Sequence, residues 1–212
     1  MKIREINLLF AEIVFTKILN QLSNDELNKI NDVLKNLDYH KTGGGTPVKN
    51  YLSSISKNLY ILDLPELKKL ADIIKDEFNN FKNNTLKYTY NDFVYTTSWA
   101  TKCEPGQESY LHNHSNCFYS GVFYTDVNSD SGKLHLSSMK KNNLLLKKSE
   151  ETDYNSDSIN VTTLKKMVIF FPSNLHHKIN FNNSNITRYS IAFNFIPTGD
   201  LGLNDSRLVL KQ

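Results

Sequence analysis

From Tyr88 onward the chain alternates apolar and polar residues with a period of two and is rich in β-branched and aromatic residues. Residues two apart on a strand point to the same face, so this pattern predicts half-buried strands rather than helices. Turn-forming residues separate the predicted strands, which are Phe93–Ala100, Phe118–Thr125, Lys133–Leu136, Ser158–Val161, Lys166–Phe171, His177–Phe181 and Arg188–Phe195. Seven or eight short strands without helices between them predict a cupin-like, double-sheet jelly roll instead of a βαβ sheet.

The first part of the chain carries helix signals instead. Residues 23–26, Ser-Asn-Asp-Glu, match a capping box, and apolar residues at helical spacing then predict a helix from Asp25 to Leu37. A second start signal at residues 63–66 contains Pro65 and precedes an apolar stripe from Leu67 to Phe81. We expect both helices to pack on the outside of the sheet. The prediction is a mostly β fold with N-terminal helices in one domain, residues 1–212, with a helical support region at 1–87 and a jelly-roll core at 88–212.

Composition limits the partners and the compartment. A net charge of +3 with scattered lysines does not indicate a nucleic-acid partner. The two cysteines, Cys103 and Cys117, make a poor disulfide framework, which favours a reducing compartment. Acidic residues interrupt the apolar run at the N-terminus, which therefore predicts neither a signal peptide nor a membrane span. We expect a soluble, cytoplasmic protein with no membrane partner, and no feature of the chain specifies an oligomeric state.

Two histidines two residues apart, His112 and His114, are candidate metal ligands. On an extended strand both side chains point to one face and can hold one ion. A third imidazole from another strand would complete one face of an octahedron and leave positions open for small molecules. That geometry is typical of a non-haem Fe(II) oxygenase, although the usual triad carries one carboxylate. Imidazole also binds Zn, Cu and Ni, so the histidines alone do not choose the metal.

The expected third ligand is His177. If Leu175 turns inward at the end of the preceding strand, His177 shares its face and His176 points away. His135 is read as an ordinary exposed histidine of a strand.

Arg188 and Ser190 also lie two apart on a predicted strand. A guanidinium fork beside a hydroxyl is suited to holding a carboxylate inside a barrel, and a structural ion pair is the alternative reading of the arginine. In the same register Ala192 and Asn194 would face inward as a pocket floor. The large apolar residues of the strand, Ile191, Phe193 and Phe195, would pack in the opposite layer.

Taken in order, five segments resemble a known family. They are Ser98-Trp99, His112-Asn113-His114, the run Ser120–Tyr124, the run Phe171–His177, and the run Arg188–Asn194. Together they resemble the Fe(II)- and 2-oxoglutarate-dependent oxygenases, and most closely a prolyl-hydroxylase-like group common in tailed phages and some bacteria. The resemblance extends over roughly residues 97–202.

The resemblance implies a double-stranded β-helix that uses Fe(II), 2-oxoglutarate and O2. It implies that His112, His114 and His177 bind the metal, that Arg188 and Ser190 bind the far carboxylate of 2-oxoglutarate, and that catalysis needs no other residue. The partner would be an unidentified substrate, either a peptide or protein or a small metabolite, in the host cytoplasm if the chain is phage-encoded.

One ligand departs from the broader superfamily, because His114 stands where Asp or Glu is usual. A neutral ligand there leaves the site one charge unit more positive. Glu108 or Asp126 could supply a carboxylate instead, although neither has the strand spacing to His112.

Loops and aromatic residues near the site are expected to shape access. At least one of the long polar segments, Lys102–Tyr110 and Lys140–Ser158, should border the pocket mouth. The glycine-rich segment His40–Pro47 lacks the order of a phosphate loop and is read as a flexible loop that could cover a site. The expected pocket aromatics are Trp99, Tyr119 and Tyr124.

Two other readings stay open from the sequence. The first is a non-catalytic jelly-roll binding or phage structural module whose histidines are vestigial or hold zinc. The pair of Arg188 and Ser190 argues against it, because a binding module needs no dicarboxylate anchor beside a metal. The second is a cupin-type three-histidine dioxygenase or isomerase without a keto acid, in which Arg188 would contact the substrate.

Overall fold

The computed structural model describes residues 11–42, 52–138, 146–152 and 154–210. The helices in this part of the chain are α1 (Asn24–Lys35) and α2 (Lys68–Phe81). The strands are β1 (Phe15–Ile18), β2 (Tyr39–Lys41), β3 (Ser54–Ser56), β4 (Phe93–Cys103), β5 (Tyr119–Asp126), β6 (Leu134–Ser137), β7 (Ser158–Val161), β8 (Met167–Pro172), β9 (His176–Ile179), β10 (Arg188–Pro197), β11 (Gly199–Leu201) and β12 (Leu208–Leu210).

Two antiparallel sheets form the body of the fold. The large sheet has the order β1-β8-β5-β10-β4-β3-β2, and the small sheet has the order β7-β6-β9. β11 and β12 pair with each other as a separate hairpin. The mostly β, jelly-roll class predicted from the period-two pattern is confirmed, and each of the seven predicted strands is present within three residues of its predicted ends.

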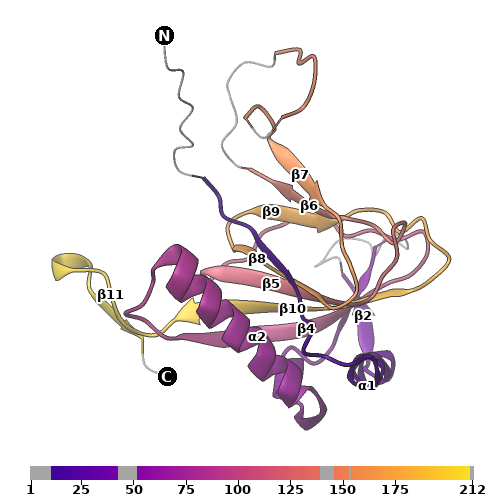
Figure 1. Ribbon diagram of the computed structural model, residues 1–212, viewed down its shortest axis with the longest axis horizontal. Helices are drawn as coiled ribbons and strands as arrows, with labels where there is room; N and C mark the ends of the chain where they lie inside the picture. The colour runs from indigo at the N-terminus through magenta and orange to yellow at the C-terminus, as the bar shows by residue number, and fades with distance from the viewer. Residues whose placement is uncertain (1–10, 43–51, 139–145, 153, 211–212) are drawn as a thin grey trace.

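The two helices begin for different local reasons. At α1 the predicted capping box forms, since the Glu26 amide donates to Ser23 Oγ (3.2 Å) and the Ser23 amide donates to Glu26 Oε2 (2.8 Å). α2 begins later than its start signal suggested, because Pro65 opens a 3-10 turn over Pro65–Leu67 instead. α2 then runs across the outer face of the large sheet, in front of β4, β10 and β5 (Figure 1).

The large sheet separates two apolar cores. On its outer face Phe78 of α2 stacks on Phe195 with ring centroids 4.1 Å apart, and Phe170 and Phe193 belong to the same cluster. On its inner face a second cluster lies between the sheets and includes Val122, Tyr124, Leu134, Leu136, Ile169 and Phe171. Each central strand therefore contributes alternate residues to two different interiors.

The strand register sets which side chains share the inner face. Ser190 of β10 lies opposite Tyr124 of β5 and Thr101 of β4. Four residues further along β10, Asn194 lies opposite Ser120 and Thr97. Ile191, Phe193 and Phe195 belong to the outer cluster, as predicted.

The predicted division at residue 87 into a helical support region and a jelly-roll core describes the first part of the chain incompletely. Residues before it supply β1, which pairs with β8, and β3, which pairs with β4, so the support region is part of the large sheet and not helical only. Among the described residues, no helix combines the length and the apolar character that crossing a membrane requires.

Candidate functional site

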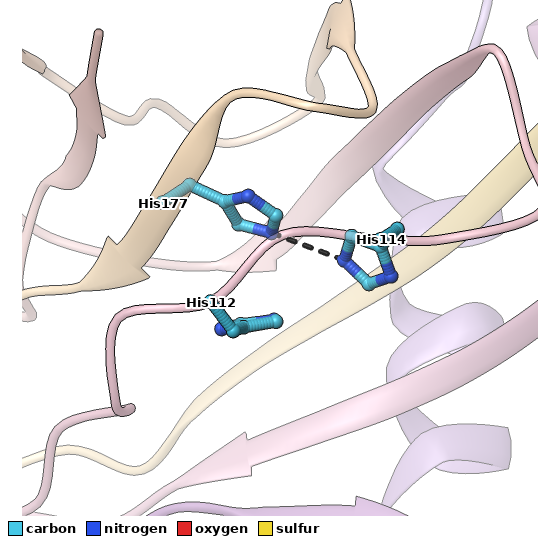
Figure 2. A group of neighbouring side chains, drawn as sticks. All are labelled: His112, His114 and His177. Atoms are coloured by element: carbon cyan, nitrogen blue, oxygen red, sulfur yellow. Dashed lines mark hydrogen bonds between the residues drawn. The ribbon is translucent and has the colours of Figure 1, made fainter. Parts of the chain in front are cut away.

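Three imidazoles converge between the two sheets. One ring nitrogen from each of His112, His114 and His177 lies within 4.8 Å of the others. His177 comes from β9, and the other two come from the segment that leads into β5 (Figure 2). The Nε2 atoms of His114 and His177 are 3.1 Å apart.

The expectation that His112 and His114 sit on a strand is wrong in detail. Both lie on an extended connection between β4 and β5, where His112 forms only an isolated bridge to His177. The bridge consists of two backbone hydrogen bonds between these residues, 3.0 and 2.7 Å long, and the His114 amide donates to the carbonyl of Ser173 at 3.0 Å. These bonds replace the strand pairing and hold the connection against β8 and β9.

Neighbouring carbonyls set the tautomers of two of the rings. His112 Nδ1 lies 2.9 Å from the Tyr110 carbonyl oxygen, and His177 Nδ1 lies 3.0 Å from that of Leu175. A carbonyl oxygen only accepts, so each Nδ1 carries the proton and each Nε2 keeps a lone pair. Such an outer partner is the usual support of a metal-binding histidine.

Burial keeps the three rings neutral. It lowers the pKa of His112, lowers that of His114 to about 4, and lowers that of His177 to about 3, where the neighbouring His112 adds to the effect. Neutral imidazole is the form that ligates a metal.

The other candidate ligands lie outside this cluster. Glu108 forms a salt bridge with Lys178 at 2.9 Å, and Asp126 forms one with Lys165 at 3.0 Å, so neither replaces His114. His176 is half-buried and is not part of the group, which agrees with its predicted direction away from the site.

The spacing of the ligand atoms fits one metal ion. Two nitrogens bound at right angles to one ion, each at about 2.1 Å, are themselves about 3.0 Å apart. The Nε2 atoms of His114 and His177 show nearly that separation. The three residues therefore fit a metal bound by imidazoles only.

A cavity of about 380 Å³ opens beside the three histidines. The large sheet lines it with alternate residues of three strands, Thr97, Trp99, Thr101, Ser120, Val122, Tyr124, Ser190, Ala192 and Asn194. The small sheet contributes Leu134, His177 and Ile179. Ser109 and Tyr110 also line it, so the segment Lys102–Tyr110 borders the cavity as expected.

Arg188 and its neighbours carry unpartnered polar atoms. Arg188 is fully buried, and its Nη1 donates to the Gly132 carbonyl at 2.8 Å. Within the described part of the chain, Arg188 Nε and Nη2, Ser190 Oγ and Tyr124 Oη are buried without a hydrogen-bond partner. Burial lowers the pKa of Arg188 and raises that of Tyr124 to about 12.

A buried guanidinium that lacks an anion is costly, as are buried hydroxyls that lack a partner. A carboxylate is the kind of acceptor that such donors bind, and 2-oxoglutarate carries one at its far end. Ser190 and Tyr124 line the cavity, whereas Arg188 itself does not, and lies with its guanidinium carbon 5.7 Å from the centre of the Tyr124 ring. The expectation that Arg188 and Ser190 together hold a carboxylate inside the barrel is therefore modified, because only Ser190 lines the cavity. The residues present fit the cosubstrate.

The predicted pocket aromatics separate onto two faces. Trp99 lines the cavity with its ring centroid 5.3 Å from that of His114. Tyr119 was wrongly placed there: it packs on the helix side, 5.8 Å from Phe78 and 5.7 Å from Phe81 between ring centroids. The reason is strand alternation, because Tyr119 points opposite to Ser120, Val122 and Tyr124.

Sequence reasoning missed several polar residues of the cavity. Thr97 and Thr101 flank Trp99 at a spacing of two, so the same alternation would have placed them beside it. The glycine-rich loop lies mostly in residues 43–51, outside the described residues, as does part of the segment Lys140–Ser158.

Comparison with known proteins points to one family. Residues 97–194 match the sequence profile of the family described as "Putative 2OG-Fe(II) oxygenase". This region is similar to that family, and the match covers just under half of the chain. The matched stretch contains all three histidines, Arg188 and Ser190, and proteins of this family are dioxygenases that require Fe(II), 2-oxoglutarate and O2. No curated protein sequence matches the oxygenase.

Solved structures share the fold of the oxygenase at low sequence identity. An oxidoreductase of the 2OG-Fe(II) oxygenase family from Burkholderia pseudomallei has a TM-score of 0.62 at 10% identity, over 86% of this chain and 84% of that one. A Trichoplax adhaerens prolyl hydroxylase, in complex with a hypoxia inducible factor peptide fragment, has a TM-score of 0.61 at 13% identity, over 86% and 83%. HygX from Streptomyces hygroscopicus, with nickel, 2-oxoglutarate and hygromycin B bound, has a TM-score of 0.61 at 14% identity, over 87% and 83%. The fold is thus the double-stranded β-helix of these oxygenases.

Proposed function

We propose that this chain, residues 1–212, is one oxygenase domain that hydroxylates an organic substrate with Fe(II), 2-oxoglutarate and O2. The observation that carries the proposal is one cavity lined by the three histidines and by Ser190 and Tyr124, with the buried guanidinium of Arg188 next to Tyr124. Three neutral imidazoles lie at one place, and unpartnered donors suited to a carboxylate lie at another.

The three histidines are proposed to hold Fe(II). His112 and His177 would bind through Nε2, because hydrogen bonds to carbonyls occupy their Nδ1 atoms. His114 takes the place where the superfamily usually has a carboxylate. With three neutral ligands, the charge of the ion is balanced by the cosubstrate and not by the protein.

Arg188, Ser190 and Tyr124 are proposed to hold the far carboxylate of 2-oxoglutarate. The guanidinium supplies two free donor atoms, and the two hydroxyls each supply one donor. Because the guanidinium is buried and otherwise lacks an anion, the carboxylate is bound as a charge partner as well as a hydrogen-bond acceptor.

When bound, Fe(II) with 2-oxoglutarate and O2 supplies the oxidation that places one oxygen atom on a substrate carbon and the other in succinate. The chain positions the reactants and limits water around them. Val122, Leu134 and Phe171 give the cavity apolar walls between the sheets. Relatives of this fold bind a peptide fragment in one case and hygromycin B in another, so both a peptide or protein and a small metabolite fit the proposal.

An anaerobic titration tests the proposal. Fe(II) and then 2-oxoglutarate are added to the chain while the visible charge-transfer band of the iron–keto acid chelate is recorded. We expect a saturable band that His112→Ala abolishes and that Arg188→Lys shifts to higher 2-oxoglutarate concentration. Zinc binding without any 2-oxoglutarate binding would instead support a non-catalytic module.

A further inference from the structure

The end of the cavity beside His114 is built from a chain of neutral hydrogen-bonding groups. Ser173 Oγ and Ser120 Oγ lie 2.9 Å apart, and Ser120 Oγ donates to Asn194 Oδ1 at 2.7 Å. Asn194 Nδ2 in turn donates to Thr97 Oγ1 at 3.1 Å. None of these four side chains belongs to the proposed metal or carboxylate sites.

The direction of this chain determines what Thr97 presents. Ser120 fixes the Asn194 amide with its oxygen toward the serines and its nitrogen toward Thr97. Thr97 Oγ1 accepts that bond, and among the described residues it donates to no other group. Its proton is available to an acceptor in the cavity, which Thr97, Ser120 and Asn194 all line.

This end of the cavity is separate from the carboxylate anchor and close to the proposed metal. Asn194 lies four residues beyond Ser190 on β10, which is about 13 Å along a strand. Trp99, which lies opposite Ala192, has its ring 5.3 Å from that of His114. A substrate held here would therefore sit beside the imidazoles without competing for the Arg188 region.

The cavity lining is uncharged. Apart from the histidines, none of the described residues that line it is Asp, Glu, Lys or Arg, and apolar side chains such as Ile55, Leu59 and Trp99 lie among the neutral polar ones. A charged group held at this end, away from Arg188, would lose hydration without gaining a charge partner among the side chains that line it. The lining thus discriminates by charge as well as by shape.

We propose that this end of the cavity is a substrate subsite for an uncharged apolar group that carries a hydrogen-bond acceptor, such as an amide carbonyl. Trp99 packs against the apolar part, and the Thr97 hydroxyl donates to the acceptor. The role of this subsite in catalysis rests on the proposed function, but its selectivity is a property of these side chains and can be measured alone.

Trp99 is the only tryptophan of the chain, so its fluorescence reports on this subsite. Three probes of similar shape differ in charge: N-acetyl-leucinamide is neutral, N-acetyl-leucine is an anion, and leucinamide is a cation. They are titrated into the full chain with and without Fe(II) and 2-oxoglutarate under anaerobic conditions. We expect saturable binding of the neutral probe, and binding at least tenfold weaker for both charged probes.

Matched variants assign the selectivity to residues. Thr97→Val keeps the shape but removes the donor, and should lower the affinity for the neutral probe about fivefold. Thr97→Ser keeps the donor and should bind this probe as tightly as the unmodified chain does. Asn194→Asp introduces a charge and should move the preference toward the cation. Circular dichroism of each variant checks that it is folded.

Several outcomes would overturn the subsite. These are no saturable response to the neutral probe, equal or tighter binding of a charged probe, or equal affinities for the valine and serine variants. The visible band of the iron–keto acid chelate is measured in the same samples. If the charge-transfer band forms normally but the three probes bind with equal affinity, only the subsite is contradicted. If the probes bind selectively but no band forms, only the proposed oxygenase site is contradicted.

Discussion

The Nε2 atoms of His114 and His177 face each other at 3.1 Å, and only one of them can carry a proton. His177 donates from Nδ1 to Leu175, so its Nε2 must accept, and His114 Nε2 must donate. A metal bound by both Nε2 atoms displaces that proton. Binding of the ion therefore requires His114 to change its tautomer, whereas His112 and His177 already have theirs.

The first prediction concerns the charge at position 114. His114→Asp restores a carboxylate, and its attraction to the ion should tighten Fe(II) binding at pH 7 by about tenfold or more. His114→Asn, which is close in size and neutral, is the control. Competition with a chromophoric chelator measures both affinities. If the asparagine variant binds as tightly as the aspartate variant, charge at this position does not limit retention.

The second prediction concerns the carboxylate anchor. Ser190→Ala and Tyr124→Phe each remove one donor and should lower the affinity for 2-oxoglutarate about fivefold or more. The reason is that hydrogen bonds to charged groups contribute about 1.5–3 kcal/mol. Fe(II) affinity in the absence of 2-oxoglutarate should stay unchanged, since neither residue belongs to the histidine cluster. Titration calorimetry, first with Fe(II) and then with 2-oxoglutarate, measures the two affinities separately. Unchanged 2-oxoglutarate affinity in both variants would remove Ser190 and Tyr124 from the carboxylate anchor.

The third prediction follows from the depressed histidine pKa values. The unfolded chain binds protons near the ordinary value of 6.5, whereas folded His114 and His177 resist them down to about 4 and about 3. The unfolded state thus binds more protons in this window, so the metal-free chain should lose stability as the pH falls from about 6.5 toward 4. His177→Gln should reduce that slope by up to about 1.4 kcal/mol per pH unit. Urea unfolding at several pH values tests it, and an unchanged slope in the variant would contradict it.

The fourth prediction concerns a close contact inside the large sheet. A Cβ on Gly121 would meet Phe193 Cε2 at 2.3 Å and the Ile169 carbonyl oxygen at 2.9 Å, so the phenyl ring occupies the space that this glycine leaves. Gly121→Ala should therefore lower the free energy of unfolding by about 2 kcal/mol. Phe193→Leu in the same chain should recover part of that loss. Additive losses in the double variant would show that the two residues do not compete for space.

The strands from β4 to β10 could be predicted because alternation is a local property of each segment. β1, β2 and β3 could not, because each exists through its pairing with another strand and not through a local pattern. The sequence around these strands carries instead the signals of a glycine-rich loop and of helices. Their place in the sheet is a tertiary effect.

The candidate site shows the same limit. The residue types of the metal and carboxylate groups were recognisable, but the strand assumed for His112 and His114 was not formed. Backbone hydrogen bonds to His177 and Ser173 align His112 and His114 instead, and residue spacing along the chain cannot predict such bonds. The face of Tyr119 was misjudged because the inward face of β5 begins one residue later, at Ser120.

The alternation along β10 separates two structural roles within one strand. Tyr189, Ile191 and Phe195 hold the helix-side core, while Ala192 and Asn194 face the cavity. Changes at the second set alter the walls of the cavity without disturbing the packing on α2. One strand can thus keep the protein folded while the range of accepted molecules diverges, and a mutational library at Thr97, Ala192 and Asn194 would explore that range while leaving the helix-side core unchanged.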